Sequence, residues 1–283
     1  MGYFLTVISE IWETSFQAMG GHLTLGLGGI LFLGFPAAFW CGAYGYAVAA
    51  HAGVPIFISC IIGIALAVLS GVVFAFFYSR MSNDSFAVIT LASVVAMDAL
   101  IRSWDSLTGG MLGIAGVPRL SPGETLKELV IIETFIACAA LLVESFLVHS
   151  AFGRSLRALK ENKSALIAMG TSAKRTGQLA LLIACLLVGI SGILAASRIQ
   201  FLDPSLGGLF LLMQTLTITI IANTPKTFRL LGITIVIVIL PEILRFFDLP
   251  TSILGYSRNL LYGFMLILLI YYVVYNTSVK RNV

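Results

Sequence analysis

The chain of 283 residues is 59% apolar and only 11% charged, with a formal net charge of +4. About a quarter of the residues in soluble domains are charged, so this composition excludes a water-soluble protein and indicates an integral membrane protein. Backbone polar groups in the bilayer core must be satisfied internally, which leaves helices or closed barrels. The long unbroken apolar runs favour helices. We therefore expect an all-α fold, with residues 1–283 forming a single polytopic transmembrane helical bundle.

Apolar runs suitable for membrane spans follow one another along the whole chain, since a span needs about 20 apolar residues. The nine predicted spans are 4–27, 30–51, 54–79, 85–104, 127–149, 175–199, 207–223, 228–247 and 257–276. Within the first two, the glycine-rich stretch GGHLTLGLGGILFLGFP (20–36) is compatible with either a helix break or a re-entrant turn. Such backbone is tolerated at membrane depth only when it is buried in protein.

The positions of lysine and arginine predict the orientation. If the connection at 150–174 is cytoplasmic and the spans alternate from it, eleven of the 17 basic residues lie inside and six outside. An odd number of spans then places the N-terminus outside and the C-terminus in the cytoplasm. Because the basic residues are accounted for by the orientation of the spans in the membrane, the net positive charge does not indicate a nucleic-acid partner. We expect no metal or cofactor, because neither a metal-ligand cluster nor a G-x-x-x-x-G-K-[ST] phosphate loop is present.

The densest basic cluster lies in FGRSLRALKENKSALIAMG (152–170), which has the pattern of a short amphipathic helix. The basic residues are Arg154, Arg157, Lys160 and Lys163, and the apolar residues on a different side are Leu156, Leu159, Leu166 and Ile167. A helix of this kind lies on a lipid surface or docks into a groove of a partner protein. A basic loop that only enforces topology is the alternative.

The order of residues in this stretch resembles the cytoplasmic coupling loop of branched-chain amino acid ABC importer permeases, specifically the M-type membrane subunit. The resemblance implies that residues 150–174 form a cytoplasmic coupling loop, whose short helix sits in a cleft on an ATPase subunit. Gly170 is expected to end that helix. The ATPase-coupling residues implied in this way are Phe152, Gly153, Arg154, Arg157, Glu161, Ala165 and Gly170.

Further stretches carry the same resemblance in the same order. AMGGHLTLGLGGILFLGFPAAFWCGAY (18–44) is similar, without gaps, to a glycine-rich stretch and early span of the family. FAVITLA followed by WDSLTGGMLGIAGVP (86–118) looks like a span and external loop, and LPEILRF (240–246) matches near the end. The sequence departs from the family in ANTPKTFRLLG (222–232), where a glycine-rich segment is usual. We also expect the chain to lack the extra N-terminal span that is common in the family, and His22 occupies the position of a typical polar residue.

Ionisable residues inside spans are costly, so they are candidates for function. Glu10, Glu13 and Gln17 are spaced by three and four residues and share one helical face. They form either a polar wall at the outer mouth of a transport pathway or a group that lies within reach of water at the interface. The candidate pathway or packing residues are Glu10, Glu13, Gln17, His22, Gly34, Thr108, Gly109 and Gly110.

The remaining charges within the spans are expected to pair locally. Glu133 and Glu144 are three turns apart on one face, and Glu144 is expected to pair with Arg154 or Arg157. Pairs four and three residues apart are expected to neutralise one another, namely Asp98 with Arg102 and Glu242 with Arg245. Most of the glycines, including those of GISGILAAS (189–197), are expected to permit tight helix packing.

The resemblance implies a permease subunit of an ABC importer for amino acids, branched-chain amino acids or related small polar solutes, working by ATP-driven alternating access. Its implied partners are two cytoplasmic ABC ATPase subunits, a second homologous permease, an external solute-binding protein and membrane lipid. The chain itself is expected not to be an enzyme, and its location is a bacterial-type inner (plasma) membrane. Two alternatives remain at this point: a standalone secondary transporter or channel, and a degenerate permease that acts as a membrane scaffold.

Overall fold

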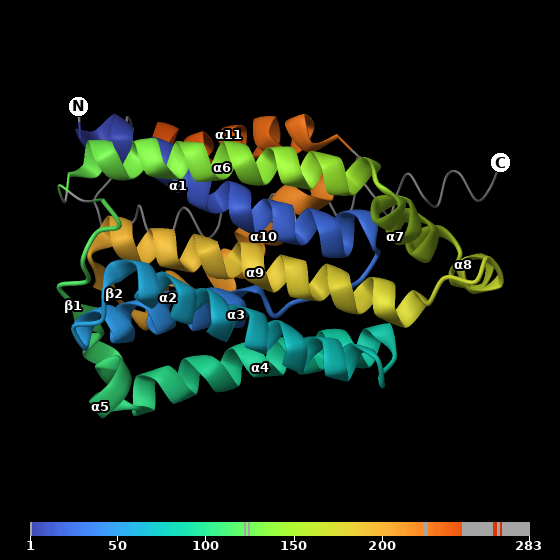
Figure 1. Cartoon of the computed structure of the whole chain (residues 1–283), viewed down its shortest axis with the longest axis horizontal. Coiled ribbons are helices and arrows are strands. Elements are labelled where there is room, and N and C mark those ends of the chain that lie inside the picture. The colour runs from blue at the N-terminus through green and yellow to red at the C-terminus, as the bar shows by residue number, and fades with distance from the viewer. Residues whose placement is uncertain are drawn as a thin grey trace.

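The computed structural model describes residues 2–121, 123, 125–222, 226–244, 263, 264 and 267. Helices make up almost all of this part of the chain, and most of them run lengthwise along the molecule (Figure 1). The long helices are α1 (Gly2–Gly21), α2 (Phe35–His51), α3 (Ile56–Tyr78), α4 (Asn83–Ser103), α6 (Leu126–His149), α9 (Ala173–Ile199), α10 (Gly208–Ala222) and α11 (Thr227–Leu244).

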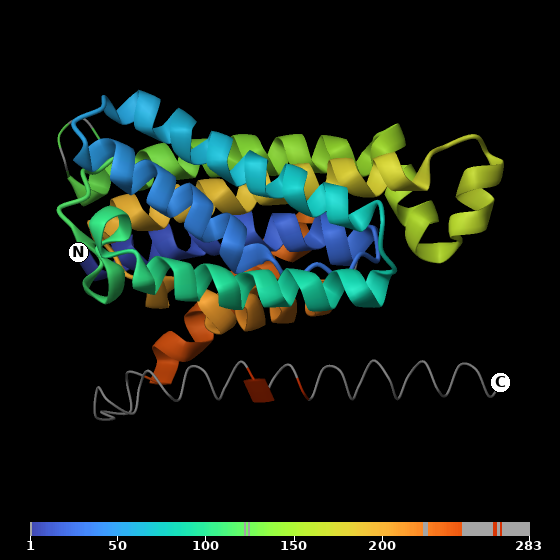
Figure 2. The same cartoon turned by 90° about the horizontal axis from the view of Figure 1, so that it is seen from below.

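Short elements gather at the two ends of the long helices. They are the π-helical turn η1 (His22–Leu27), α5 (Asp105–Thr108), η2 (Gly110–Leu112), β1 (Ile114–Ala115), α7 (Ala151–Glu161), α8 (Lys163–Ala168), β2 (Phe201–Leu202) and η3 (Pro204–Leu206). The N-terminus, α5, β1 and β2 lie at one end, and α7 and α8 project from the opposite end (Figures 1 and 2). We call these the outer and inner ends, following the predicted orientation. Strands β1 and β2 pair antiparallel, with Ile114 opposite Leu202.

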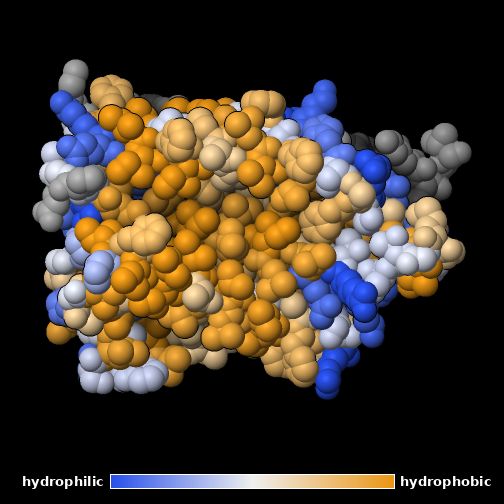
Figure 3. All heavy atoms as spheres, viewed as in Figure 1, coloured by the Kyte–Doolittle hydropathy of each residue, from blue (hydrophilic) through white to orange (hydrophobic). Residues whose placement is uncertain are grey.

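On the face seen in Figure 3, an apolar band covers the middle of the molecule, and polar residues gather at its two ends. Among the described helices, α3, α4, α6, α9 and the segment Pro204–Ala222 are long and apolar enough to cross a membrane. These features confirm the prediction of an all-α membrane protein. The count of nine spans stays a prediction, because five helices meet this criterion and the last predicted span, 257–276, lies almost entirely outside the described residues.

The glycine-rich stretch forms a helix break. Helix α1 continues into the π-helical turn η1, residues 28–34 are not helical, and α2 begins at Phe35, later than expected (Figure 1). Gly29 has a φ of +63°, a left-handed conformation that favours glycine. The N–H of Ile30 donates to the carbonyl of Thr24 at 3.0 Å, and the N–H of Leu33 donates to Thr90 Oγ1 at 3.2 Å. The break is therefore tolerated because protein groups satisfy its backbone.

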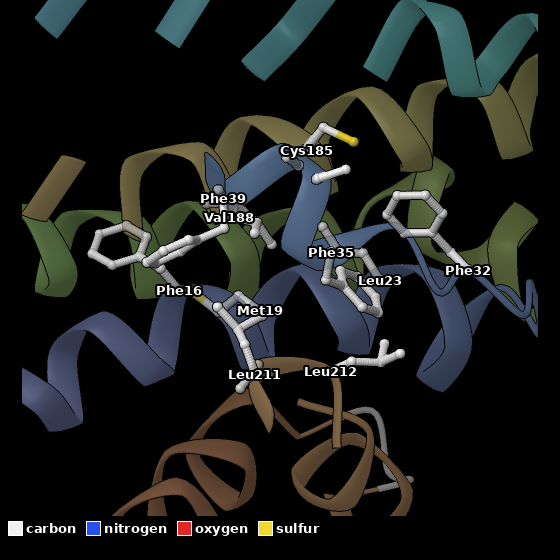
Figure 4. Packing of buried hydrophobic residues seen from close by; sticks show 14 of the residues in the cluster. Phe16, Met19, Leu23, Phe32, Phe35, Phe39, Cys185, Val188, Leu211 and Leu212 are labelled. Carbon is white, nitrogen blue, oxygen red and sulfur yellow. The ribbon is translucent and has the colours of Figure 1, made fainter. Parts of the chain in front are cut away.

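Helix α9 lies at the centre of the bundle, where it packs on α1, α2 and α3. Its contact with α2 depends on glycine: a Cβ on Gly192 would lie 2.3 Å from the carbonyl oxygen of Phe39, and a Cβ on Gly42 would lie 2.2 Å from that of Gly189. Phe16 and Met19 of α1 and Leu23 of η1 lie on another side of the same core (Figure 4). The predicted role of these glycines in tight helix packing is confirmed.

Gly192→Ala is expected to destabilise the fold, since its new Cβ has no room against the α2 backbone. Overpacking of this kind costs about 1–3 kcal/mol. Gly232→Ala in α11 is the matched control, because a Cβ there meets no atom within 4 Å. Alanine is the better helix former by about 1 kcal/mol, so this control should be neutral or stabilising. Thermal unfolding of the detergent-solubilised variants measures the difference, and equal stability of the two would contradict the packing argument.

Candidate functional site

A polar pocket lies toward the outer end, between α1, α9 and α10. The cavity has a volume of about 300 Å³. Its charged and amide-bearing lining residues are Glu10, Glu13, Gln17, Arg198 and Gln214, and its apolar lining includes Phe39, Ala195, Leu206, Phe210 and Leu211. We call this cavity the outer pocket. The structure thus brings three of the predicted pathway residues together and adds an arginine from a helix far along the chain.

Glu13 and Arg198 form a two-pronged ion pair in the wall of the outer pocket. Nε of Arg198 lies 2.6 Å from Oε1 of Glu13, and Nη2 lies 2.9 Å from Oε2. Glu13 is 4% exposed, so it is buried rather than held in water at the interface. Bidentate pairs of this kind fix the orientation of both groups. The arginine is therefore presented to the cavity in a defined position.

Gln17 lies about one turn further inward and is also held in place. Its Nε2 donates to Oγ of Ser191 at 2.9 Å, and its Oε1 accepts from Oγ1 of Thr215 at 3.5 Å. These two partners come from α9 and α10, so the amide joins three helices. A buried amide with both ends engaged adds specificity to the packing, because leaving either end unpaired carries a desolvation cost.

Glu133 of α6 lies behind the ion pair. It is fully buried and interacts electrostatically with Glu13 and Arg198. Neither carboxylate oxygen of Glu133 has a hydrogen-bond partner among the described residues. One guanidinium thus faces several carboxyl groups at this level of the bundle. No group of three or more His, Cys, Asp or Glu within the described ranges is suited to hold a metal ion.

A second buried pair lies toward the inner end. Nδ1 of His22, in the π-helical turn, lies 2.7 Å from Oε1 of Glu144, and both side chains are at most 1% exposed. The prediction that Glu144 pairs with Arg154 or Arg157 is therefore wrong. Those two arginines donate instead to the carbonyl oxygens of His149 and Val148, each at 3.1 Å. The last turn of a helix carries unsatisfied carbonyls and partial negative charge, which attract the arginines to the end of α6.

The predicted coupling stretch forms two short helices. Leu156, Leu159 and Leu166 are buried, as the amphipathic pattern predicts, whereas Ile167 is 56% exposed. Gly153 permits the sharp connection from α6, because a Cβ there would lie 2.1 Å from the carbonyl oxygen of Val148. Of the other residues singled out in this stretch, the exposed ones are Arg154, Glu161, Ala165 and Gly170, and the half-buried ones are Phe152 and Arg157.

Helix α7 packs directly on the helix break. Nζ of Lys160 donates to the carbonyl oxygen of Gly26 at 2.8 Å. A Cβ on Gly28 would lie 3.2 Å from Cδ2 of Leu156, and one on Gly29 would lie 2.9 Å from Cγ of Lys160. Burial against the break lowers the pKa of Lys160, and the charge of Glu161 opposes this shift. The basic helix and the interruption in α1 are thus one mechanical unit.

Helix α8 begins at a cap formed by Asn162, whose Oδ1 accepts from the N–H of Ala165 at 3.0 Å. It ends before Gly170, which has a φ of +79°. The expectation that Gly170 ends the helix is confirmed. The turn that follows presents Met169 at 69% exposure, close to the exposed Ile167. Apolar side chains exposed on a projection beyond the apolar band are typical of a protein-interaction surface.

Thr108, Gly109 and Gly110 shape the outer loop and do not line the outer pocket. Thr108 Oγ1 lies 2.6 Å from the carbonyl oxygen of Ile101. Gly109 and Gly110 have φ values of +72° and +56°, which favour glycine. Gly34 has a similar structural role, because a Cβ there would lie 2.6 Å from the ring of Phe32. These four predicted residues therefore position the backbone around the site.

The other predicted ion pairs have different outcomes. Asp98 and Arg102 form the expected pair, with 2.9 Å between Oδ2 and Nε, which confirms that prediction. Arg245 lies outside the described residues, and Glu242 accepts a hydrogen bond from the hydroxyl of Tyr3. In the divergent segment 222–232, the structure describes all residues except 223–225. Helix α10 ends at Ala222, and α11 begins at Thr227.

Sequence reasoning did not identify Arg198 and Gln214 as site residues. Arg198 was counted only as one of the six basic residues predicted outside, although it lies within the run 175–199. It follows its partner Glu13 by 185 positions. An arginine inside the predicted limits of a span was the available signal. Gln214 gave a similar signal, as a lone amide within the run 207–223.

A protein-family model matches nearly the whole chain. The family model for the branched-chain amino acid transport system / permease component matches residues 3–273. The high-affinity branched-chain amino acid transport system permease protein LivM of Escherichia coli is 24% identical over 281 residues, which cover 89% of this chain and 65% of the relative. LivM of Salmonella typhimurium is 23% identical with the same coverage. The chain thus spans 65% of the length of these curated relatives.

A solved structure has a similar fold. PsaBC from Streptococcus pneumoniae, in complex with Fab, superposes with a TM-score of 0.54 at 15% identity, covering 93% of this chain and 88% of the matched chain. At this identity the likeness concerns the fold alone. The helices described above therefore have an overall arrangement that the matched chain shares.

Proposed function

The chain belongs to the family of branched-chain amino acid transport system permease components, and from this premise we propose that it is the permease subunit of an ABC importer. Its solutes are amino acids, branched-chain ones or related small polar solutes. The family and the apolar helices together indicate a multi-pass protein of the inner membrane. The observation that carries the coupling part of the proposal is the contact of α7 with the helix break, through Lys160 and Gly26.

In the proposed mechanism, partner subunits hydrolyse ATP and α7–α8 receives their motion. Two cytoplasmic ATPases close on ATP binding and displace the projecting helices. Since α7 holds the π-helical turn of α1, the displacement reaches Gln17 and Glu13 on the same helix. Rigid helices joined by a fixed contact carry a movement of this kind over a long distance. The outer pocket then alternates in access between the two sides of the membrane.

The partners of the proposed assembly follow from its role as the permease subunit of an ABC importer. Two ATPases engage the inner end, a second homologous permease completes the pair, and an external solute-binding protein docks at the outer end, on loops such as 105–126. The outer loop is held against the bundle, since Tyr46 donates to the carbonyl of Pro118 at 2.8 Å and Leu120 N–H donates to Ser197 Oγ at 2.8 Å. A fixed loop is suited to docking, because little ordering entropy is lost on binding.

Met169→Asp is expected to reduce copurification of the ATPase subunits at least tenfold. The variant places a charge on an exposed apolar side chain of the proposed contact, and tenfold corresponds to about 1.4 kcal/mol. Met111→Asp is the matched control: Met111 is 73% exposed and Met169 is 69% exposed, but Met111 lies in η2 at the outer end. Affinity purification of the tagged permease from membranes that contain the ATPases, followed by quantitative blotting, gives the ratio.

Several results would contradict the proposed function. If Met169→Asp and Met111→Asp retain the ATPases equally, α8 does not form the contact. Uptake of amino acids that persists without any ATPase would favour a standalone carrier. An intact assembly that moves no solute would favour a membrane scaffold, the alternative suggested by the divergent segment 222–232.

A further inference from the structure

The outer pocket combines charged walls and apolar walls in one small cavity. Its lining includes the charged residues Glu10, Glu13 and Arg198 together with the aromatic residues Phe39 and Phe210. Ionisable groups are costly within a membrane bundle, so several of them facing one cavity require an explanation beyond packing. A volume of about 300 Å³ lies at the small end of the range for small-molecule sites. The cavity therefore fits a small solute with polar and apolar parts.

The charges of the pocket are arranged for a ligand that carries both signs. Among the described residues, two carboxylates and one guanidinium line the cavity, so groups of both charges are available to one ligand. Glu13 uses two of the five N–H donors of Arg198. Glu10 lies one turn before Glu13 and lines the same small cavity as Arg198, so anionic and cationic groups share one space. An ammonium group and a carboxylate on one carbon atom require such closeness.

Neutral polar groups complete the charged side. Gln17 is held by Ser191 and Thr215, so its amide has a fixed direction, and Gln214 lines the cavity from α10 at 6% exposure. Amides accept from an ammonium and donate to a carboxylate, so they suit either end of a zwitterion. The two phenylalanine residues of the lining offer an apolar surface to the remainder of the solute.

A second cavity, larger than the outer pocket, does not have this chemistry. It has a volume of about 440 Å³ between α2, α3, α4 and α5, and its described lining residues include Trp40, Val48 and Leu66 but no acidic or basic side chain. Size alone would select this cavity. A ligand with an ammonium and a carboxylate group needs a partner for each charge, because an unpaired charge is strongly disfavoured in an apolar site. The outer pocket supplies such partners, and the larger cavity does not.

We infer that the outer pocket is a binding site for a zwitterionic amino acid with an apolar side chain, with the ammonium group at Glu10, the carboxylate at Arg198 and the side chain against Phe39 and Phe210. This inference deepens the proposed function and rests on it. It assigns recognition of the solute to the permease itself. Arg198 is held by Glu13, which makes Glu13 a positioning residue.

Glu10→Gln tests the assignment with little change in shape. The probes are radiolabelled L-leucine and two leucine analogues as competitors: 4-methylpentanoate, which lacks the ammonium group, and 3-methylbutylamine, which lacks the carboxylate. In the complete reconstituted importer, the variant is expected to raise the KM for leucine at least tenfold. Competition by the amine should weaken, whereas competition by the carboxylate should strengthen, because a repelling charge has been removed. The change in the ratio of the two competition constants distinguishes altered solute recognition from a general loss of transport activity.

Glu128→Gln is the matched control, since Glu128 lies at the same end of the bundle but does not line the pocket. It should leave the KM and both competition constants unchanged. Equilibrium binding of labelled leucine to the purified assembly without ATP gives a second readout that does not depend on coupling. There too, Glu10→Gln should weaken binding at least tenfold.

The outcomes distinguish this inference from the proposed function. If Glu10→Gln transports and binds leucine as the wild type does, with an unchanged competition ratio, the pocket is not the recognition site, although the importer stands. An equal response of Glu10→Gln and Glu128→Gln would also overturn the assignment. If the wild-type assembly hydrolyses ATP but neither binds nor moves leucine, the amino-acid part of the proposed function fails together with this inference.

Discussion

Replacing Glu144 by leucine is expected to lower the free energy of unfolding by about 3–5 kcal/mol, because the change breaks a buried pair and leaves one partner behind. Oε1 of Glu144 lies 2.7 Å from Nδ1 of His22, and water does not reach either group. The double variant His22→Leu/Glu144→Leu removes both partners and should recover part of the loss. Unfolding in mixed micelles measures the three free energies, and the double-mutant cycle gives the coupling between the two residues.

The exposed pair Asp98–Arg102 supplies the comparison for this experiment. Its side chains are 35% and 37% exposed, so solvent screens the interaction. Asp98→Ala is expected to cost no more than about 1 kcal/mol. A cost for Glu144→Leu as small as that for Asp98→Ala would show that the buried pair does not stabilise the bundle.

Lys160→Met is expected to reduce uptake by about 10- to 100-fold while leaving assembly with the ATPases and ATP hydrolysis in place. Methionine keeps the apolar stem but removes the donor to the carbonyl of Gly26. A hydrogen bond from a charged group contributes about 1.5–3 kcal/mol, and its loss shifts a two-state equilibrium by a corresponding factor. Parallel measurements of uptake and ATP hydrolysis in proteoliposomes would show hydrolysis uncoupled from transport.

Lys163→Met is the control for this second prediction. Lys163 is an exposed residue of α8, so the same substitution removes a similar charge from the same projection. It should leave the ratio of uptake to hydrolysis unchanged. If Lys160→Met also leaves that ratio unchanged, the contact between α7 and the helix break does not transmit the motion.

These two predictions concern the same segment of α1. The π-helical turn His22–Leu27 is held by α6 through Glu144 and by α7 through Lys160. The first contact is buried within the bundle, and the second lies on the projecting helix. The same turn therefore contacts both the buried bundle and the projecting helix.

Several local features could be predicted from the sequence because they depend on near neighbours. The buried positions of Leu156 and Leu159 follow from helical periodicity, and the Asp98–Arg102 pair follows from a spacing of one turn. The break after Gly28 follows from the low helix propensity of glycine. Ile167 was placed on the same apolar side as Leu156 and Leu159, but it is exposed. The prediction assumed one continuous helix, whereas α7 ends at Glu161 and a new helix begins at Lys163.

Pairing across the bundle could not be predicted in the same way. Glu144 was expected to bind the nearest arginines, whereas its partner His22 is 122 positions away. Arg198 lies 185 positions from Glu13 and Gln17 lies 174 from Ser191. Helical periodicity places each of these groups on a face of its own helix, but it does not say which helix lies opposite that face.

The sequence by itself determined the membrane environment, the helical class, the amphipathic inner projection and the family of permeases to which the chain belongs. Each depends on composition or on residues close together in the chain. Only the tertiary structure decided that α1, α9 and α10 enclose a charged pocket, and that α7 holds the interruption in α1. The physical reason is that glycine contacts such as that of Gly192 with Phe39 select the neighbouring helices, and that selection determines which buried charges meet.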